Sequence, residues 1–237
     1  MGDTPLGWAA WNGHQEVVKL LLSRDDIDPN KPDVGGRTPL SGAAENGHEG
    51  VARLLLDRDD INPNKSDEYG QTPLLLAACM GHAGVVKMLL GRDDVDPNKP
   101  DNLNQTPLWW AARNGEEGVL EILLGRDDVN PDKSNEYCQT PLLMAIGKKG
   151  QEGVVEMLLG RDDVNPDKPD DHGRTPLWWA AWAGKEGLVK ILLRRDDVDP
   201  DRPDNFNETP LTIATLNRHK GVIALLQPLS SAAHSAA

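Results

Sequence analysis

Six short strings of Asp and Asn residues come nearest, by residue type, to a metal site. The first is Asp26-Ile27-Asp28-Pro29-Asn30, and its cognates begin at positions 60, 94, 128, 163 and 197. Oxygen ligands at this spacing open the calcium loop of an EF-hand, which also needs Gly at its sixth position and Glu at its twelfth. The first string has Lys31 and Arg37 there, and no other string has both required residues. Side chains that close turns around proline explain the strings better, so we predict no metal site.

The other residues that could do chemistry do not form a catalytic pattern. Cys79 and Cys138 lack the sequence context of a nucleophile, and two cysteines give no disulfide framework. No Gly-rich phosphate loop, Gly-x-Ser-x-Gly motif or paired-carboxylate motif is present. No Cys or Asp lies at ligand spacing from the histidines of the repeating pattern, His14, His48, His82 and His219. The sequence therefore predicts no enzyme, no catalytic residue and no cofactor.

The charge and hydropathy of the chain narrow the class of partner. The formal net charge is −13, whereas binding to nucleic acid or to an acidic membrane needs clustered Lys and Arg. No apolar run reaches the ~18 residues of a membrane span, and the start "MGDTPLGWAA" lacks the order of a signal peptide. We therefore expect a cytoplasmic or nuclear protein with a protein or peptide partner, and neither nucleic acid nor membrane as a partner.

The elements that must position these residues come from one repeating unit. Thr-Pro-Leu begins at seven positions, 34 or 35 residues apart: Thr4, Thr38, Thr72, Thr106, Thr140, Thr175 and Thr209. Self-similarity with a period of about 20 to 50 residues is typical of repeat architectures. We predict a single array over residues 1–237, with repeats that begin near residues 3, 33, 67, 101, 135, 170 and 204. Residues 228–237 follow the last repeat and are expected to form a disordered tail.

Each unit reads as two short helices and a polar loop. Thr followed by Pro is typical of a helix start, because the Thr hydroxyl caps free amides and Pro suits the first helical position. A glycine such as Gly115 then ends the first helix. A second helix carries apolar residues at helical spacing and stops before a proline such as Pro131. Two short helices cannot bury an apolar face alone, so each unit must stack on its neighbours.

The segment "GRTPLSGAAENGHEGVARLLLDRDD" (36–60) closely resembles an ankyrin repeat, whose hallmark is a Thr-Pro-Leu helix, Ala-Ala, Gly-His and a Leu-rich helix. The resemblance covers residues 3 to about 227. It implies an all-α ankyrin-repeat solenoid of seven helix–turn–helix units of about 34 residues with β-hairpin-like loops. It also implies that the four histidines hydrogen-bond to backbone near the turn between helices.

Two features depart from the commonest ankyrin pattern. The His that usually follows Thr-Pro-Leu is replaced in every repeat, for example by Trp109. The usual Gly-Ala-Asp-Val after the second helix becomes Arg-Asp-Asp-Val. The second departure is similar to the C-terminal arrays of fungal NACHT-type (NOD-like) sensor proteins. That resemblance implies a recognition segment of a larger intracellular sensor, and we expect the chain to be a piece of a longer protein.

The resemblance places the binding surface on a concave face made by the hairpin tips and the first helices. The hairpins contribute Tyr69, Gln71, Leu103, Gln105, Tyr137, Gln139, His172, Arg174 and Phe206. The first helices and their ends contribute Trp11, Glu45, Asn46, Met80, Trp109, Arg113, Asn114, Trp178 and Trp182. The hairpin and helix-end positions vary among the repeats far more than the core Leu and Ala do. Aromatic residues and Met among them are typical of recognition surfaces.

The tryptophans divide into two expected groups. Neighbours on a helix point about 100° apart, so paired tryptophans cannot both occupy the centre of one buried stripe. Packing against the adjacent repeat is expected for Trp8, Trp110 and Trp179, as in related arrays. The other four are expected to be partly exposed anchors: Trp11, Trp109, Trp178 and Trp182.

These features together predict a non-catalytic module that binds a protein partner on its concave face, as a monomer rather than a homo-oligomer. Two alternatives remain open at this point. The array could be a self-associating scaffold, with the tryptophan patches as its interface. It could also bind a glycan or another ligand on its aromatic platforms.

Overall fold

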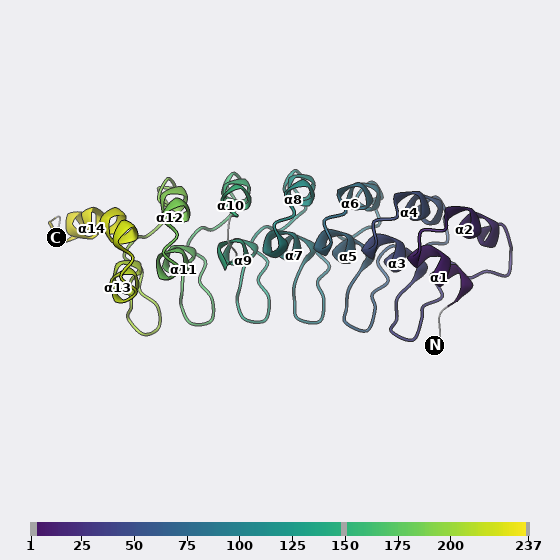
Figure 1. The fold of residues 1–237 in the computed structure, drawn as a ribbon, viewed down its shortest axis with the longest axis horizontal. Helices are drawn as coiled ribbons and strands as arrows, with labels where there is room; N and C mark the ends of the chain where they lie inside the picture. Colours follow the sequence, from purple (N-terminus) through teal and green to yellow (C-terminus); the bar gives the residue numbers. More distant parts are fainter. Residues whose placement is uncertain (1–3, 148–150, 236–237) are drawn as a thin grey trace. The chain divides into compact units, whose positions relative to one another are not determined.

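The computed structural model describes residues 4–147 and 151–235, with side chains described as far as residue 227. Within those ranges the chain forms fourteen helices and no strand (Figure 1). The first helices of the seven repeats are α1 (Pro5–Trp11), α3 (Pro39–Glu45), α5 (Pro73–Cys79), α7 (Pro107–Asn114), α9 (Pro141–Gly147), α11 (Pro176–Trp182) and α13 (Pro210–Leu216). The second helices are α2 (Gln15–Leu22), α4 (Glu49–Leu56), α6 (Ala83–Leu89), α8 (Glu117–Leu124), α10 (Glu152–Leu159), α12 (Glu186–Leu192) and α14 (Lys220–Ser235). The all-α repeat solenoid expected from the sequence is confirmed.

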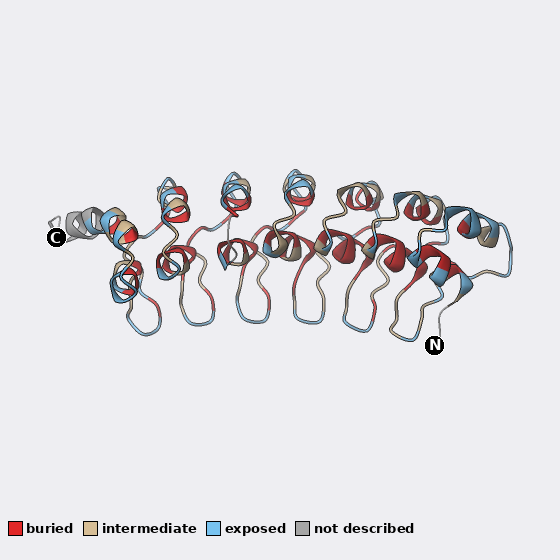
Figure 2. Ribbon diagram, in the orientation of Figure 1, coloured by how far each residue is buried: buried red, intermediate tan, exposed pale blue. Residues whose placement is uncertain are grey.

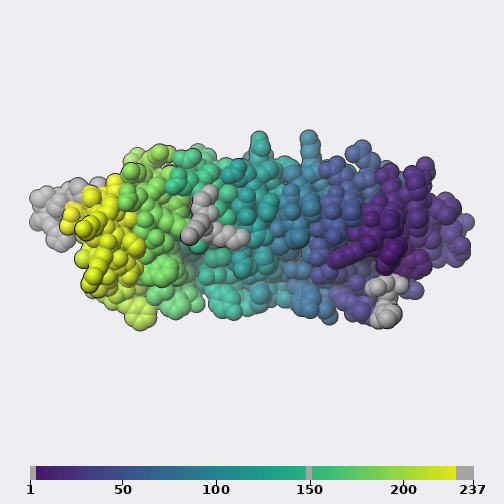
Figure 3. Space-filling view, in the orientation of Figure 1, coloured from purple at the N-terminus to yellow at the C-terminus, as the bar shows by residue number. Residues whose placement is uncertain are grey.

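The chain divides into two compact units. Unit 1 spans Met1–Asn130 and holds α1 to α8, and unit 2 spans Pro131–Ala237 and holds α9 to α14. In unit 1 the first helices pack in the order α1, α3, α5 and α7; in unit 2 the order is α9, α11 and α13. Figure 3 shows the repeats within each unit as successive bands of colour. Helix α14 extends into the segment for which the sequence predicts disorder.

Helix ends follow the chemistry of the repeat. The hydroxyl of Thr72 accepts a hydrogen bond from the backbone N–H of Leu75, and the same cap recurs at Thr4, Thr38, Thr106, Thr140, Thr175 and Thr209. Glycines with positive φ, such as Gly115 at 80°, follow the first helices, as predicted. Gly150 lies outside the described residues. In the last repeat Arg218 adopts this conformation, at φ 60°.

The core lies between the two helix layers and between neighbouring first helices. Five of the first helices (α1, α3, α5, α7 and α11) carry paired alanines, such as Ala77 and Ala78, which are fully buried because their small side chains let adjacent helices approach closely. Leucines of both layers complete it, for example Leu74 and Leu89. Figure 2 shows this buried face in red along the first helices, with exposed residues at the loop tips.

The Arg-Asp-Asp motif joins neighbouring repeats. The guanidinium of Arg92 forms two hydrogen bonds to Asp94 and a third, of 2.8 Å, to the carbonyl oxygen of Leu56 at the end of α4. Arg58, Arg126 and Arg195 make the equivalent bond to Leu22, Leu90 and Leu159. A cation at a helix C-terminus donates hydrogen bonds to the free carbonyl oxygens and interacts favourably with the helix dipole. This departure from the usual ankyrin pattern therefore has a structural role.

Three of the four histidines make the backbone contact that the resemblance implies, whereas the contact described for His14 is with the ring of Trp8, with centroids 5.3 Å apart. Nε2 of His48, His82 and His219 lies 2.9–3.0 Å from the carbonyl oxygens of Trp11, Glu45 and Trp182 in the preceding repeat. In repeat six, Lys185 occupies the histidine position and donates to Ile146 O at 2.7 Å. In repeat four, Asn114, two residues before that position, donates to Cys79 O. These hydrogen bonds join neighbouring repeats and stabilise the stack.

Candidate protein-binding surface

Each hairpin is built on a side-chain turn. Oδ1 of Asp67 accepts hydrogen bonds from the N–H groups of Tyr69 and Gln71, at 3.0 and 2.8 Å. The same pair of bonds is made by Asp33, Asp101, Asn135, Asp170 and Asp204. The residue before the last hairpin position has positive φ and is Gly70 or its cognates Gly36, Asn104, Cys138, Gly173 and Asn207. The hairpins are thus held by their own hydrogen bonds and by bonds to the next hairpin, such as Asn102 N to Tyr69 O.

From repeat three onward, the residue two positions after the Asp or Asn that closes this turn is exposed at the tip of the hairpin. These residues are Tyr69 and Leu103 in unit 1, and Tyr137, His172 and Phe206 in unit 2; we call them the tip residues. Tyr69 is 59% exposed and Phe206 is 67% exposed. All five are residues that the sequence places on the binding surface. Apolar and aromatic side chains held in water by a rigid backbone are typical of binding surfaces.

The bases of the hairpins are less accessible than the tips. Gln71, Gln139 and Arg174 are half-buried. Gln105 is only 6% exposed. The expectation that Gln105 belongs to the binding surface is therefore wrong, because its side chain is buried.

The ends of the first helices form the second part of the surface. Trp11, Met80 and Trp182 are 39%, 54% and 47% exposed, and Asn46 and Arg113 are also exposed. Glu45 and Asn114 are half-buried. Glu45 lies 2.9 Å from Nη1 of Arg37, and burial raises the pKa of its carboxyl.

Three tryptophans are placed differently from expectation. Trp109 and Trp178 are 2% and 3% exposed, so the prediction that they are partly exposed anchors is wrong. Both lie three residues after the capping Thr, where Leu75 and Leu143 are also buried; these leucines are the sequence signal that would have found this. Trp8 is 57% exposed, so its expected packing against a neighbouring repeat is also wrong.

Trp110 and Trp179 are half-buried, and each is fixed by a hairpin carboxylate. Their indole N–H groups donate to Oδ2 of Asp101 and Asp170, at 3.1 and 2.9 Å. These carboxylates close the hairpins with their other oxygen.

Arg113 and Arg174 lie over the rings of the paired tryptophans of α7 and α11. The guanidinium carbon of Arg174 lies 4.5 Å from the ring centroid of Trp178 and 5.5 Å from that of Trp179. Arg113 is placed in the same way over Trp109 and Trp110. These cation–π contacts shield the paired rings from solvent. The second tryptophan of each pair thus joins its helix to the hairpin, and Trp178 also donates to Glu208 O in the next repeat at 3.1 Å.

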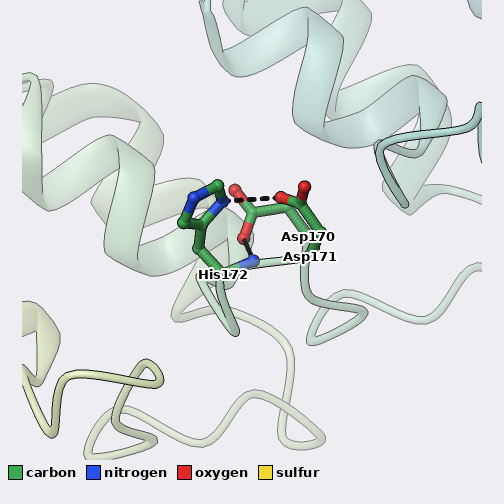
Figure 4. A group of neighbouring side chains, drawn as sticks. All are labelled: Asp170, Asp171 and His172. Carbon is green, nitrogen blue, oxygen red and sulfur yellow. Dashed lines mark hydrogen bonds and ion pairs between the residues drawn. The ribbon is translucent and has the colours of Figure 1, made fainter.

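The acidic strings close turns, as predicted. Oδ1 of Asp28 accepts from Asn30 N at 2.8 Å, and Asn62, Asp96, Asn165 and Asp199 repeat this bond. A separate group, Asp170, Asp171 and His172, has three potential ligand atoms within 4.8 Å (Figure 4). Both oxygens of Asp170 already accept hydrogen bonds, and His172 Nδ1 lies 2.6 Å from Asp171 Oδ1. This arrangement does not favour a metal ion.

Each unit contains a cavity that is lined by residues of the first helices and of a hairpin. In unit 1 a cavity of about 410 Å³ is lined by Trp8, Trp11, Asp33 and Arg37, among other residues of α1 and the second hairpin. In unit 2 a cavity of about 180 Å³ lies between α9 and α11.

None of the helices in the described ranges is long and apolar enough to cross a membrane.

Comparison with known proteins agrees with this architecture. Residues 28–101, 93–170 and 142–234 match the family model of ankyrin repeats in three copies, and residues 1–34 match the model of a single ankyrin repeat. No curated protein matches the chain in sequence.

Several solved structures have the same fold. The ankyrin repeat domain of Bcl-3, a member of the IkappaB protein family, is 25% identical with a TM-score of 0.83, covering 95% of this chain and 99% of that one. The human ASB11 ankyrin repeat domain is 24% identical with a TM-score of 0.78, over 94% and 97% of the two chains. The ankyrin repeat protein EF0377 is 25% identical with a TM-score of 0.75, over 81% and 98%. The chain therefore belongs to the ankyrin repeat family, whose members generally mediate protein–protein interaction.

Proposed function

We propose that this chain binds a protein partner through its tip residues and the exposed ends of its first helices. The observation that carries the proposal is the series of exposed tip side chains on hairpins closed by their own hydrogen bonds. A rigid backbone lowers the entropy lost on binding, and aromatic anchors supply most of the energy of an interface.

The proposed contact residues have exposed side chains and lie at the hairpin tips or at the ends of the first helices. They are Trp11, Asn46, Tyr69, Met80, Leu103, Arg113, Tyr137, His172, Trp182 and Phe206. The half-buried Glu45, Gln71, Asn114, Gln139 and Arg174 would support them. The proposed role needs no cofactor and no catalytic step.

The resemblance to C-terminal arrays of fungal NACHT-type sensors extends the proposal. In such a protein the array would recognise a ligand or restrain a nucleotide-driven switch in the cytoplasm. The Arg-Asp-Asp-Val form of the repeat supports this context. We further propose that the isolated chain is monomeric.

Affinity enrichment with matched variants tests the proposal. The parent chain, a tip variant (Tyr69→Ser, Tyr137→Ser and Phe206→Ser together) and a control variant (Val17→Ser and Leu20→Ser) are immobilised and exposed to an extract of the source organism. The control removes apolar side chains from α2 that are 46% and 69% exposed.

We expect a protein that is retained by the parent and the control and lost by the tip variant, with all three chains melting at similar temperatures. Equal retention by the tip variant would contradict the proposal. Light scattering on the parent gives the mass in solution, and a mass that grows with concentration would favour the scaffold alternative.

A further inference from the structure

Repeat five differs from every other repeat at one position of its first helix. Seven residues after the capping Thr the chain has Trp11, Glu45, Cys79, Arg113, Trp182 or Leu216, but in α9 it has Gly147. A Cβ atom built on Gly147 would meet no atom of the described residues within 4 Å, its chain neighbours aside. The missing side chain therefore leaves space beside α9 that none of the residues described in the structure fills.

This space is part of the cavity of unit 2. The cavity has a volume of about 180 Å³ and is lined by Leu143, Met144, Ile146 and Gly147 of α9, by Trp179, Trp182 and Ala183 at α11, and by Gln139. Most of these side chains are apolar. The indole N–H of Trp179 is already bound to Asp170 at 2.9 Å, so the ring offers hydrocarbon rather than a donor to the cavity.

The tryptophan wall of the cavity is formed before any ligand arrives. The rings of Trp179 and Trp182 meet edge to face, with centroids 5.5 Å apart. The backbone at Trp182 is held from the next repeat, because its carbonyl oxygen lies 3.0 Å from His219 Nε2. A preformed apolar site binds without a large ordering cost.

The volume of the cavity indicates what kind of group it can hold. An apolar protein cavity of about 150 Å³ is known to hold a benzene molecule. The cavity beside Gly147, at about 180 Å³, therefore fits one large apolar side chain such as Leu, Met or Phe. It is too small for a folded element of a partner.

The acidic hairpins beside the cavity indicate the charge of the partner, although one cation, Lys185, donates to Ile146 O of the cavity wall at 2.7 Å. Gln139, on its rim, follows the tip residue Tyr137 by two positions. The three hairpins of unit 2 (135–139, 170–174 and 204–208) hold five acidic residues and one arginine, and that arginine, Arg174, lies 3.6 Å from Asp204. Glu136 and Asp171 are exposed there. Lys or Arg beside the apolar anchor would complement this charge.

We propose that the cavity beside Gly147 receives one large apolar side chain of a linear peptide segment in the partner, and that Lys or Arg next to this anchor meets the acidic hairpins. This inference rests on the proposed function and adds the chemistry of the partner to it.

The test uses a phage-displayed library of random linear peptides, selected on the full chain. We expect the selected peptides to share one Leu, Met or Phe with Lys or Arg nearby. Gly147→Phe fills the cavity, and Gly118→Phe on α8 is its control, since a Cβ there makes only an ordinary contact of 3.7 Å with Ala83.

We expect Gly147→Phe to weaken peptide binding, measured by fluorescence anisotropy, by about ten- to a hundredfold, the effect of losing one buried side chain. The control should bind like the parent. If Gly147→Phe melts early, Trp182→Ala, which removes an exposed wall of the cavity, provides the second test and should also weaken binding.

The outcomes separate the two proposals. If Gly147→Phe and Trp182→Ala bind like the parent while Tyr137→Ser and Phe206→Ser weaken binding, the cavity inference is overturned and the proposed function stands. If peptides bind and no substitution weakens binding, both are overturned. If no peptide is enriched, the cavity inference is overturned, and the affinity enrichment decides the proposed function. Enrichment of Asp or Glu beside the anchor, which Lys148 and Lys149 after Gly147 in the sequence would favour, would overturn the charge assignment.

Discussion

At the scale of single residues, two of the three tryptophans of helix α11 lie in very different environments. Trp178 is 3% exposed and its indole N–H donates to Glu208 O in the next repeat, whereas Trp182 is 47% exposed. We expect Trp178→Ala to lower the free energy of unfolding by about 3–5 kcal/mol, because it leaves a cavity in the core. Trp182→Ala should change it by less than about 1 kcal/mol. Urea unfolding of both variants checks this, and similar losses would contradict the division into core and surface tryptophans.

Asp167 provides a prediction about pH. Its cognate Asn98 donates to Asp128 O and accepts from Asn130 N, which joins two repeats. Asp167 accepts from Asp199 N through Oδ2 at 2.7 Å, but its buried Oδ1 has no hydrogen-bond partner and a carboxylate cannot donate. Burial raises the pKa of Asp167 above its usual value.

A raised pKa means that the folded state binds this proton more tightly than the unfolded chain, so this carboxylate costs stability as the pH rises through the folded pKa. We therefore expect Asp167→Asn to raise the free energy of unfolding near pH 7 by about 1 kcal/mol, through the restored amide bond. The gain should shrink at about pH 4, where the protonated Asp can also donate. Urea unfolding at both pH values checks this. A gain that is equal at both, or a loss near pH 7, would argue against this account.

At the scale of the elements, the Arg-Asp-Asp motif should stabilise the stack only where it reaches a preceding helix. Arg92 donates to Leu56 O at the end of α4, while the bonds described for Arg24 go to Asp26 alone. We expect Arg92→Met to lower the free energy of unfolding by about 1 kcal/mol, because a helix end loses its charged donor. Arg24→Met, the matched control, should leave the melting temperature unchanged. Equal effects of the two changes would show that the ion pair, and not the contact between repeats, matters.

The repeat order and the helix ends could be predicted from the sequence because they depend on local chemistry. Thr-Pro starts, Gly stops and side-chain turns act within a few residues, and Thr72, Gly115 and Asp28 all behave as expected. The environment of each tryptophan could not be read in the same way, since it depends on contacts between repeats. Comparison across repeats helps, because Leu75 marks the position of Trp109 as buried. The cavity beside Gly147 depends on residues of two helices, and no single unit reveals it.

At the scale of the whole molecule, the net charge of −13 should raise the rate at which a basic partner associates. For selected peptides that carry Lys or Arg, we expect the association rate to fall about tenfold between roughly 0.05 and 0.5 M NaCl, because salt screens long-range attraction. The dissociation rate should change much less. Stopped-flow fluorescence separates the two rates, and a neutral peptide of matched length is the control. An association rate that does not change with salt would contradict a role of charge in partner association.

Hydrogen–deuterium exchange on the complex of the full chain with a selected peptide is the most direct test of the central claim. The account predicts that the peptide slows exchange in the hairpins 135–139, 170–174 and 204–208 and at the adjoining ends of α9 and α11. It predicts no change in the second helices α10 and α12. Protection confined to the second helices, with none at the hairpins, would contradict the claim that this ankyrin array recognises its partner through the tip residues and first-helix ends.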